Sequence, residues 1–411
     1  MSERPLEGVK VVEVAMWGFV PSCGALLAEW GADVIKVEHA RLGDPQRALV
    51  RMGDFVIEPD SVNPAWEHPN HNKRSIGLDV ADPEGRKLLG ELLADADVFL
   101  TSFLPESLAK FRLTVDDVRA DNPAIIYALG SALGSKGDEA THGGYDATAF
   151  WMRAGIAHAI TPRDLDGIIP PPLPAFGDTI SGSNLAGGIA AALFKLARTG
   201  EPSVVDVSLL SSAVWASGLG LDGTLYTDFV WQGNPVGLFV SPINPVAGSY
   251  KTKDGRILML MMLQAAKFWD DFCIHIDRVD LTLDERFDAP EKLQQNAPAA
   301  TEILREVFLE RTLDEWTQKL RTLAGPWAPV QDAAQVTRDH QVRSNDMIVD
   351  LLDGDGAATG HEAVAGPVRF DGAAPVLHRA PGFAEHTDAL LAERGIAAAR
   401  IAALKEQGVL A

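Results

Sequence analysis

The chain has 411 residues, 46% of them hydrophobic and 23% charged, which is ordinary usage for a folded protein and enough for two domains. The 57 acidic side chains outnumber the 36 Lys and Arg, so the formal net charge is −21. This excess of negative charge argues against a nucleic-acid-binding protein, and any bound phosphate must be held locally by helix N-termini or a few basic side chains. The 16 Phe and nine Trp supply enough apolar surface to exclude disorder as the main state.

The two cysteines, Cys23 and Cys273, are too few for a disulfide framework or a thiolate metal site. The N-terminal residues lack the apolar core of a signal peptide. The longest apolar run, residues 257–263, is far shorter than the roughly 20 residues that span a bilayer. We therefore expect a cytoplasmic protein with no membrane partner.

The first 150 residues alternate between strand-like and helix-like patterns. A helix capped by Ser22 is expected to run to Trp30, and Asp82-Pro83 opens another helix. Regular alternation of this kind predicts an α/β fold with a parallel, doubly wound sheet. The expected strands of this part are residues 9–14, 33–38, 75–79, 98–100 and 125–127.

The pattern of predicted elements changes near Tyr226 in the middle of the chain. Before it, a long helix is expected from Gly177-Asp178 to about Arg198, ended by Gly200. After it, a hairpin signal at residues 248–256 and several helical patterns predict a smaller α+β domain over residues 226–324. Further elements are expected at 143–155 (helical), at 204–207, 347–352 and 364–370 (strands) and from 385 onward (helical).

The turn after the first strand lacks the G-x-G-x-x-G pattern, and no P-loop occurs, which disfavours nicotinamide or flavin chemistry and nucleotide hydrolysis. His68 and His71 stand three residues apart around Pro69. A metal site needs more ligands than these, so we interpret the pair as part of a solvated loop and expect no metal.

Asp178 is the carboxylate that the pattern singles out, and it has two interpretations. It stands where a long apolar helix is expected to begin, so it is a good N-cap, worth about 1 kcal/mol. Alternatively, a carboxylate between Gly177 and Gly182 is accessible to a bulky thioester and is suited to nucleophilic catalysis. Gly143, Gly144, Tyr145 and Asp146 form a second candidate group, interpreted either as a capped helix with a core aromatic or as active-site support.

The ordered set of segments resembles the class III CoA-transferase family, also called the CaiB–BaiF family, over nearly the whole chain. The motifs include Gly43-Asp44-Pro45 and Gly177-Asp178. The matching segments are 5–13, 31–38, 43–45, 72–79, 96–98, 122–127, 177–178, 198–200, 205–210, 284–287, 311–316, 326–330 and 382–387.

The resemblance implies a large Rossmann-like domain built from both chain ends (1–225 and 325–411), a small domain (226–324) and an interlocked homodimer. It implies that Asp178 is the nucleophile and that coenzyme A is a substrate rather than a tightly bound cofactor, with acyl-CoA and carboxylic acids as partners. Active-site support is expected from Gly143, Gly144, Tyr145, Asp146 and Gly177. The CoA-binding residues expected are Gly18, Phe19, His39, Arg41, Leu78, Asp79, Ser102, Phe103, Leu104 and Lys110.

The sequence departs from the family pattern at several points. Residues 101–106 replace a segment that carries a CoA-binding Arg in many members, so Lys110 is expected to serve instead. The racemases of the family have a proton-transferring His where Tyr145 stands, and a phenol with a pKa of about 10 is a poor substitute for imidazole at about 6.5. An acyl-CoA racemase or hydrolase stays open as an alternative, and a non-catalytic acyl-CoA-binding protein is a third.

Overall fold

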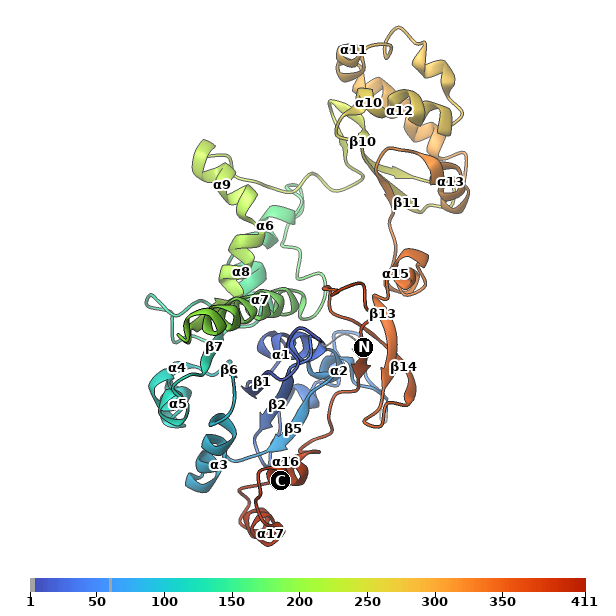
Figure 1. Cartoon of the computed structure of the whole chain (residues 1–411). Coiled ribbons are helices and arrows are strands. Elements are labelled where there is room, and N and C mark those ends of the chain that lie inside the picture. Colours follow the sequence, from blue (N-terminus) through green and yellow to red (C-terminus); the bar gives the residue numbers. More distant parts are fainter. Residues whose placement is uncertain (1–3, 59–60) are drawn as a thin grey trace. The chain divides into compact units, whose positions relative to one another are not determined.

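The computed structural model describes residues 4–58 and 61–411 and divides into two units. Unit 1 takes in the chain up to Ile160, Ile168–Trp231 and Gln341–Ala411, and unit 2 consists of Thr161–Gly167 and Gln232–His340. Figure 1 traces both units in chain order, with the two chain ends in unit 1.

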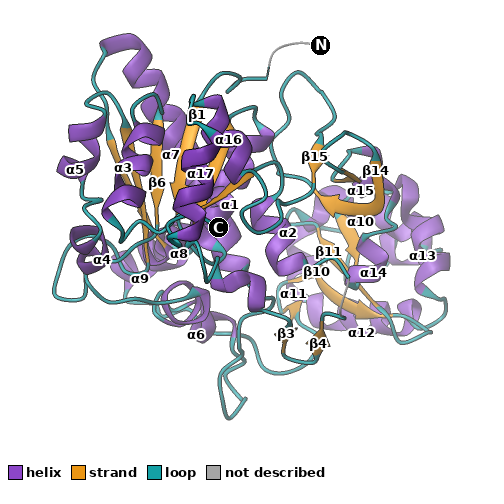
Figure 2. Ribbon diagram, turned by 90° about the horizontal axis from the view of Figure 1, so that it is seen from below, coloured by secondary structure: helices purple, strands orange, loops and turns teal. Residues whose placement is uncertain are grey.

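Unit 1 is built on a six-stranded parallel sheet, which confirms the predicted α/β fold. Its spatial order corresponds to 3-2-1-4-5-6 along the chain, the order of Rossmann-type sheets. Figure 2 shows these strands flanked by helices on both faces. In spatial order the strands are β5 (Arg74–Gly77), β2 (Asp33–Glu38), β1 (Lys10–Val14), β6 (Val98–Thr101), β7 (Ile126–Ser131) and β8 (Val204–Ser208).

Two apolar cores cover the two faces of this sheet. One core includes residues of α1 (Phe19–Glu29) and α7 (Phe176–Thr199), among them Leu27 and Leu185. The other includes α3 (Pro83–Leu93) and the C-terminal helices. The remaining helices of unit 1 are α2 (Pro64–Asn70), α4 (Pro105–Lys110), α5 (Val115–Asp121), η2 (Asp146–Met152, a π-helix), α6 (Ile156–Ile160), α8 (Leu209–Ala216), α9 (Gly218–Thr227), α16 (Thr387–Glu393) and α17 (Ala398–Glu406), with the short η1 (Pro45–Ala48).

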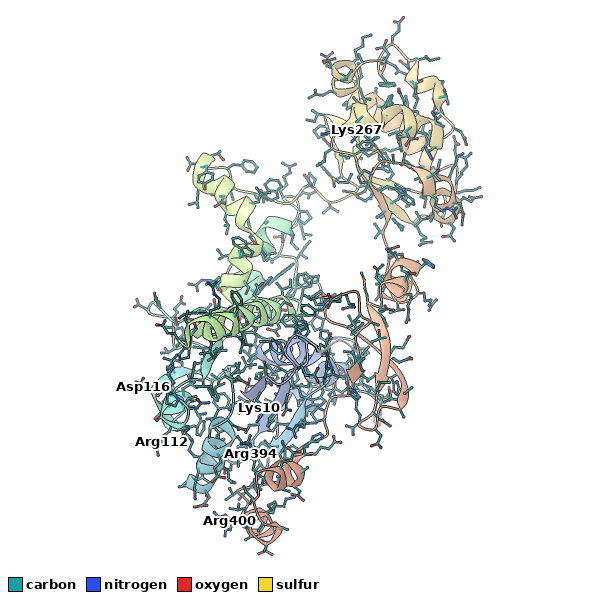
Figure 3. All side chains as sticks on the ribbon, in the orientation of Figure 1. Lys10, Arg112, Asp116, Lys267, Arg394 and Arg400 are labelled. Carbon is teal, nitrogen blue, oxygen red and sulfur yellow. The ribbon has the colours of Figure 1, made fainter. Side chains whose placement is uncertain are left out.

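Polar contacts tie the C-terminal segment to the N-terminal part of unit 1. Asp95 accepts hydrogen bonds from Lys10 Nζ at 2.6 Å and from Arg394 Nη1 at 2.7 Å. Lys10 and Arg394 are labelled in Figure 3. Backbone bonds add to this tie, since the Asp79 N–H donates to the Val409 carbonyl at 2.9 Å. The last residues of the chain therefore complete the second core.

Two small sheets complete unit 1, one from the N-terminal part of the chain and one from its C-terminal part. They are β3 (Arg51–Met52) with β4 (Phe55–Val56), and β14 (Ala358–Val364) with β13 (Ile348–Leu352) and β15 (Leu377–His378). The strand predicted at 364–370 is wrong, because β14 ends at Val364. There the chain turns, and the Gly366 N–H donates to the Glu29 carboxylate of α1 at 2.9 Å.

Unit 2 has a four-stranded antiparallel sheet packed against helices around buried Trp316, Phe308 and Tyr250. The hairpin of β10 and β11 turns at Lys253–Gly255, as the sequence indicates. Because β12 pairs with β11, this unit extends past residue 324, the boundary expected from the sequence. Its strands are β9 (Val240–Ser241), β10 (Asn244–Lys251), β11 (Ile257–Met261) and β12 (Trp327–Pro329), and its helices are α10 (Ala265–His275), η3 (Val279–Thr282), α11 (Pro290–Gln295), α12 (Ala297–Phe308), α13 (Leu313–Lys319), η4 (Leu320–Thr322) and α14 (Ala333–Val336); α15 (His340–Ser344) follows at the boundary.

Helix α7 runs across unit 1 and packs tightly on α1. A methyl group on Gly182 would lie 2.8 Å from Ser22 Cβ and 2.9 Å from the Phe19 carbonyl oxygen, so only glycine permits this close crossing. Of the described helices, α7 alone is long and apolar enough to cross a membrane, and 33% of its most apolar stretch is buried. Its packing against α1 identifies it as a core helix.

Candidate functional site

A cavity of about 630 Å³ opens at the carboxyl ends of β1, β6 and β7 in unit 1. Strand order reverses between β1 and β6, and ligands of doubly wound sheets bind at such a switch point. The walls are largely apolar and aromatic. The lining residues include Met16, Trp17, Phe19, Ser102, Phe103, Leu104, Leu129, Gly130, Ser131, Gly143, Gly144, Tyr145, Asp178 and Leu209.

Asp178 lies in the first turn of α7 and faces this cavity. Of the two interpretations of Asp178, the N-cap interpretation is wrong, because the N-cap is Ala175, with φ of 57°, and Asp178 is the third helical residue. Among the described residues, no hydrogen bond reaches the Asp178 carboxylate. Its oxygens are therefore free to react with a group that enters the cavity.

The Asp178 carboxyl is an unusually weak acid. Burial raises its pKa from 3.8 to about 7, and the negative charge of Asp146 adds to the effect. A methyl group on Gly18 would lie 2.7 Å from Asp178 Oδ2, so the turn before α1 packs directly on the carboxylate. The same packing that keeps water away also raises the free energy of the ionised form.

Asp146 begins η2 and positions the start of α7. Its Oδ2 accepts a hydrogen bond from the Gly177 N–H at 3.1 Å, while its buried Oδ1 has no partner in the described part of the chain. A methyl group on Gly177 would lie 2.4 Å from Asp146 Oδ1 and 2.3 Å from Phe150 Cγ. Burial raises the pKa of Asp146, and its backbone hydrogen bonds partly oppose that rise. Asp146 therefore acts on the helix that carries Asp178 rather than as a cap of its own helix.

Tyr145 lies on the rim of the cavity and is 59% exposed, which excludes the expectation of a core aromatic. Its ring meets that of Trp17 edge to face, with the ring centroids 5.6 Å apart. Gly143 and Gly144 precede it in the wall, and a methyl group on Gly144 would crowd Ala132 Cβ at 3.0 Å.

The structure separates the expected CoA-binding residues into two groups. Phe19, Ser102, Phe103 and Leu104 line the cavity, and Gly18 packs on Asp178. The others lie outside the lining: His39 Nδ1 accepts from the Arg41 N–H at 3.1 Å, Lys110 lies over the Phe111 ring, and Asp79 accepts from the Ala81 N–H. The Leu78 side chain belongs to the second core and is only 1% exposed.

Sequence reasoning missed several lining residues, namely Met16, Trp17, Leu209 and the end of β7. The end of β7 has a recognisable signal, because the carboxyl ends of parallel strands meet at one edge. Gly130 is required there, since a methyl group would lie 2.2 Å from Val20 Cγ2 of α1.

The interpretation of His68 and His71 as a solvated loop is wrong. Residues 64–70 form α2, and His71 is buried with its Nε2 2.7 Å from Glu29 Oε1. Burial lowers the pKa of His68. His71 thus joins the end of α2 to α1, and the described residues contain no cluster of three metal-ligating side chains.

A second cavity, of about 590 Å³, lies within unit 2. Phe239, Ile243, Met259, Met261 and Leu263 supply apolar walls. Met262, which neighbours this wall in sequence, is buried in the core of unit 2, and Phe229 and Trp231 are exposed on unit 1.

The parallel sheet and the pocket at its switch point define an α/β ligand-binding protein with a carboxylate in the pocket. The chain belongs to CoA-transferase family III, whose model matches residues 6–387, and it is an enzyme of this class. This confirms the resemblance seen in the sequence.

Characterised relatives share most of the chain. It is 33% identical to (R)-2-hydroxy-4-methylpentanoate CoA-transferase of Clostridioides difficile, over 84% of either chain. It is 32% identical to cinnamoyl-CoA:phenyllactate CoA-transferase of Clostridium sporogenes, over 94% of this chain and 93% of the relative. The crystal structure of a CaiB/BaiF family protein from Brucella suis superposes with a TM-score of 0.79 at 28% identity, covering 95% of this chain and all of that one.

Proposed function

We propose that this class III CoA-transferase moves CoA from an acyl-CoA to a free carboxylic acid through an aspartyl-CoA thioester on Asp178. One observation carries the proposal: the Asp178 carboxylate faces a largely apolar cavity at the sheet's switch point, with no hydrogen bond among the described residues. A desolvated carboxylate with unengaged oxygens is a competent nucleophile.

In the proposed reaction, an ionised Asp178 oxygen attacks the thioester carbonyl of the donor. The C–S bond breaks, which leaves a mixed anhydride on Asp178 and a CoA thiolate. The thiolate then attacks the Asp178 carbonyl, and the donor acid leaves with the bonding electrons of the C–O bond. The acceptor carboxylate reverses both steps, so Asp178 is regenerated and no redox cofactor or metal is consumed.

The environment of Asp178 suits this sequence. The first turn of a helix stabilises negative charge, which favours the carboxylate and the oxyanions formed at its carbonyl. Backbone N–H groups of Gly143, Gly144 and the Asp178 turn are the candidate oxyanion donors. The apolar walls limit hydrolysis of the anhydride and the thioester.

We expect the thioester end of CoA in the cavity beside Phe19, Ser102, Phe103 and Leu104. His39, Arg41 and Lys110 are the candidate contacts for the phosphates. The chain's net charge of −21 makes such local cations necessary, because its overall field repels an anionic ligand.

The acids that exchange CoA are proposed to carry apolar side chains. The lining of the Asp178 cavity includes Trp17, Phe19 and Leu209. The names of the two characterised relatives refer to 2-hydroxy acids with a branched aliphatic or an aromatic side chain. A 2-hydroxy acid of this type is therefore the first acceptor to test.

The homodimer expected from the sequence remains part of the proposal. Helix α9 has no buried residue in this single chain, and Leu219, Leu225 and Tyr226 are 92%, 76% and 79% exposed. Trp215 of α8 adds a further 82% exposed ring. An apolar surface of this extent favours contact with a second copy.

The test is a panel of acyl-CoA donors and carboxylic acids, read by mass spectrometry of the CoA products. The proposal predicts a new acyl-CoA only when an acceptor acid is present, and its loss in Asp178→Asn. Transfer by a folded Asp178→Asn variant at more than a few per cent of the native rate would contradict the proposed role of Asp178.

A further inference from the structure

A buried cluster of charged side chains lies behind the turn that packs on Asp178. Glu13, Lys36, Glu38, Asp44 and Lys73 are each at most 4% exposed. With Arg47, which pairs with Glu38 at 2.7 Å, the cluster holds three cations and three carboxylates. The proposed chemistry uses none of them.

Lys36 is the centre of this cluster. Its Nζ lies 3.0 Å from Glu13 Oε1 and 2.9 Å from Asp44 Oδ2. Burial alone would lower the pKa of Lys36, but the carboxylates of Asp44 and Glu13 outweigh that effect and raise it. Lys36 therefore stays charged, and its buried ammonium group is a hydrogen-bond donor.

The backbone of residues 15, 16 and 17 is held by three side chains, with one hydrogen bond to each residue. Lys36 Nζ donates to the Ala15 carbonyl at 3.0 Å. The Met16 N–H donates to Ser102 Oγ at 3.1 Å. The Trp17 N–H donates to Asp44 Oδ1 at 3.3 Å.

The turn needs such support, because Trp17 has a φ of 69°, a left-handed conformation that bulky residues rarely adopt. Strained conformations of this kind persist only where surrounding contacts fix them. The next residue is Gly18, which packs on Asp178 Oδ2, and the Trp17 ring meets Tyr145 at the cavity rim.

We propose that Lys36, Asp44 and Ser102 are positioning residues for CoA transfer, which hold the turn from Ala15 to Gly18 against Asp178 and so keep water from its carboxylate. The inference rests on the proposed role of Asp178. None of the three residues needs to react. Loosening the turn would hydrate Asp178 and return its acidity toward that of an ordinary carboxyl group.

The titration of Asp178 is read as a difference between a chain and its Asp178→Asn form, because burial lowers the pKa of Lys73 to about 8 and the cluster also titrates in this range. Asp146 of η2 is the charged neighbour that acts on it. The charges of the cluster come from β1 (Glu13), β2 (Lys36 and Glu38), the segment 44–47 and Lys73, and they balance one another.

The test compares Asp44→Ala, Asp44→Asn and Ser102→Ala in the full chain, by kcat and by the pH midpoint of kcat. Asp44→Ala removes the acceptor of the Trp17 N–H, and we expect kcat to fall about tenfold and the midpoint to fall by about one pH unit. Asp44→Asn keeps an acceptor oxygen and should restore both. Ser102→Ala leaves no buried charge unpaired, so it will fold, and it should lower the midpoint in the same direction.

Leu89→Ala is the control, because Leu89 is fully buried in the second core and is not among the residues that line the cavity. It should lower stability without moving the midpoint. Native kcat and midpoint in Ser102→Ala and in folded Asp44→Ala would overturn the inference. A midpoint shift in Leu89→Ala as large as in Asp44→Ala would overturn it too.

A readout that needs no activity separates this inference from the proposed function. The difference in Tm between a chain and its Asp178→Asn form, followed from pH 4 to pH 9, reports the titration of Asp178. If the native protein transfers no CoA, the proposed function fails. The positioning role of Asp44 and Ser102 is still supported if Asp44→Ala or Ser102→Ala lowers the pH at which this difference appears. It is contradicted if neither variant does so.

Discussion

Gly18 lies against the carboxylate of Asp178 so closely that a methyl group on its α-carbon would stand 2.7 Å from Asp178 Oδ2. The two residues come from segments 160 positions apart and meet at the switch point of the sheet. This contact shields the carboxylate from water and leaves its other side open to the cavity. The shielding explains why the Asp178 side chain is hard to ionise.

Asp178→Asn is expected to abolish CoA transfer and to stabilise the fold above neutral pH. The native state holds the Asp178 proton up to a pKa of about 7, whereas the unfolded chain releases it near 3.8. Ionisation therefore weakens the native fold as pH rises from about 4 to 7, by on the order of 4 kcal/mol, and Asn avoids this loss. Thermal melts should show equal Tm values near pH 4 and a higher Tm for the variant above pH 7. A variant less stable than the native chain at pH 8 would contradict this.

The rate of transfer is expected to rise with pH through about 7, because only the ionised Asp178 is nucleophilic. The measurement is kcat between pH 5 and 9 with a saturating donor and acceptor. A rate that is already at its plateau at pH 5 would show that Asp178 ionises normally.

Gly18→Ala is expected to lower kcat about 100-fold, because the new methyl group forces the Asp178 carboxylate from its place. Gly187→Ala is the matched control in α7, where an added methyl group meets no atom within 4 Å. The control should keep its activity and gain about 0.5–1 kcal/mol of stability from helix propensity. Equal activity of the two variants would contradict the proposed contact.

The protein is expected to be a homodimer that uses the apolar face of α8 and α9. Leu219→Glu places a charge where the side chain is 92% exposed in the single chain, and it should weaken assembly. Light scattering should give twice the chain mass for the native protein and less for the variant. A native protein that is active as a monomer would rule out the proposed assembly.

Deuterium exchange separates transfer from racemisation. Racemisation requires two groups that pass a proton at the α-carbon, and Tyr145 and Asp146 offer no such pair, since a phenol with an ordinary pKa of about 10 is a poor proton-transfer group near neutral pH. In deuterated water, a 2-methylacyl-CoA should gain no α-deuterium without an acceptor acid. Rapid incorporation would favour the racemase alternative.

The sequence sufficed to predict the α/β class, most strands of the sheet and the end of α7 at Gly200. These features depend on local signals, namely apolar periodicity and a glycine with positive φ. The start of α7 was predicted less well, because Ala175 adopts a left-handed conformation that propensity does not foresee. Likewise α1 begins at Phe19, and Ser22 is an interior residue whose Oγ donates to the Gly18 carbonyl at 2.7 Å.

The residues that line the cavity were only partly predictable, because some of them are placed by contacts between distant parts of the chain. Motif resemblance pointed to Asp178, Tyr145 and Phe103, which lie in recognisable segments. Trp17 and Leu209 enter the wall through long-range packing, which a sequence pattern does not encode. The buried cluster around Lys36 was likewise invisible, since charged residues in strands are usually expected to face solvent.

The most direct test of the account is peptide mass spectrometry of the protein after incubation with an acyl-CoA donor and no acceptor acid. We expect a CoA thioester on the peptide that contains Asp178, which hydroxylamine converts to a hydroxamate and which the acceptor acid discharges. The Asp178→Asn variant should carry no adduct. Acceptor-dependent transfer by the native enzyme without any adduct on Asp178, or with an adduct on another residue, would contradict the account.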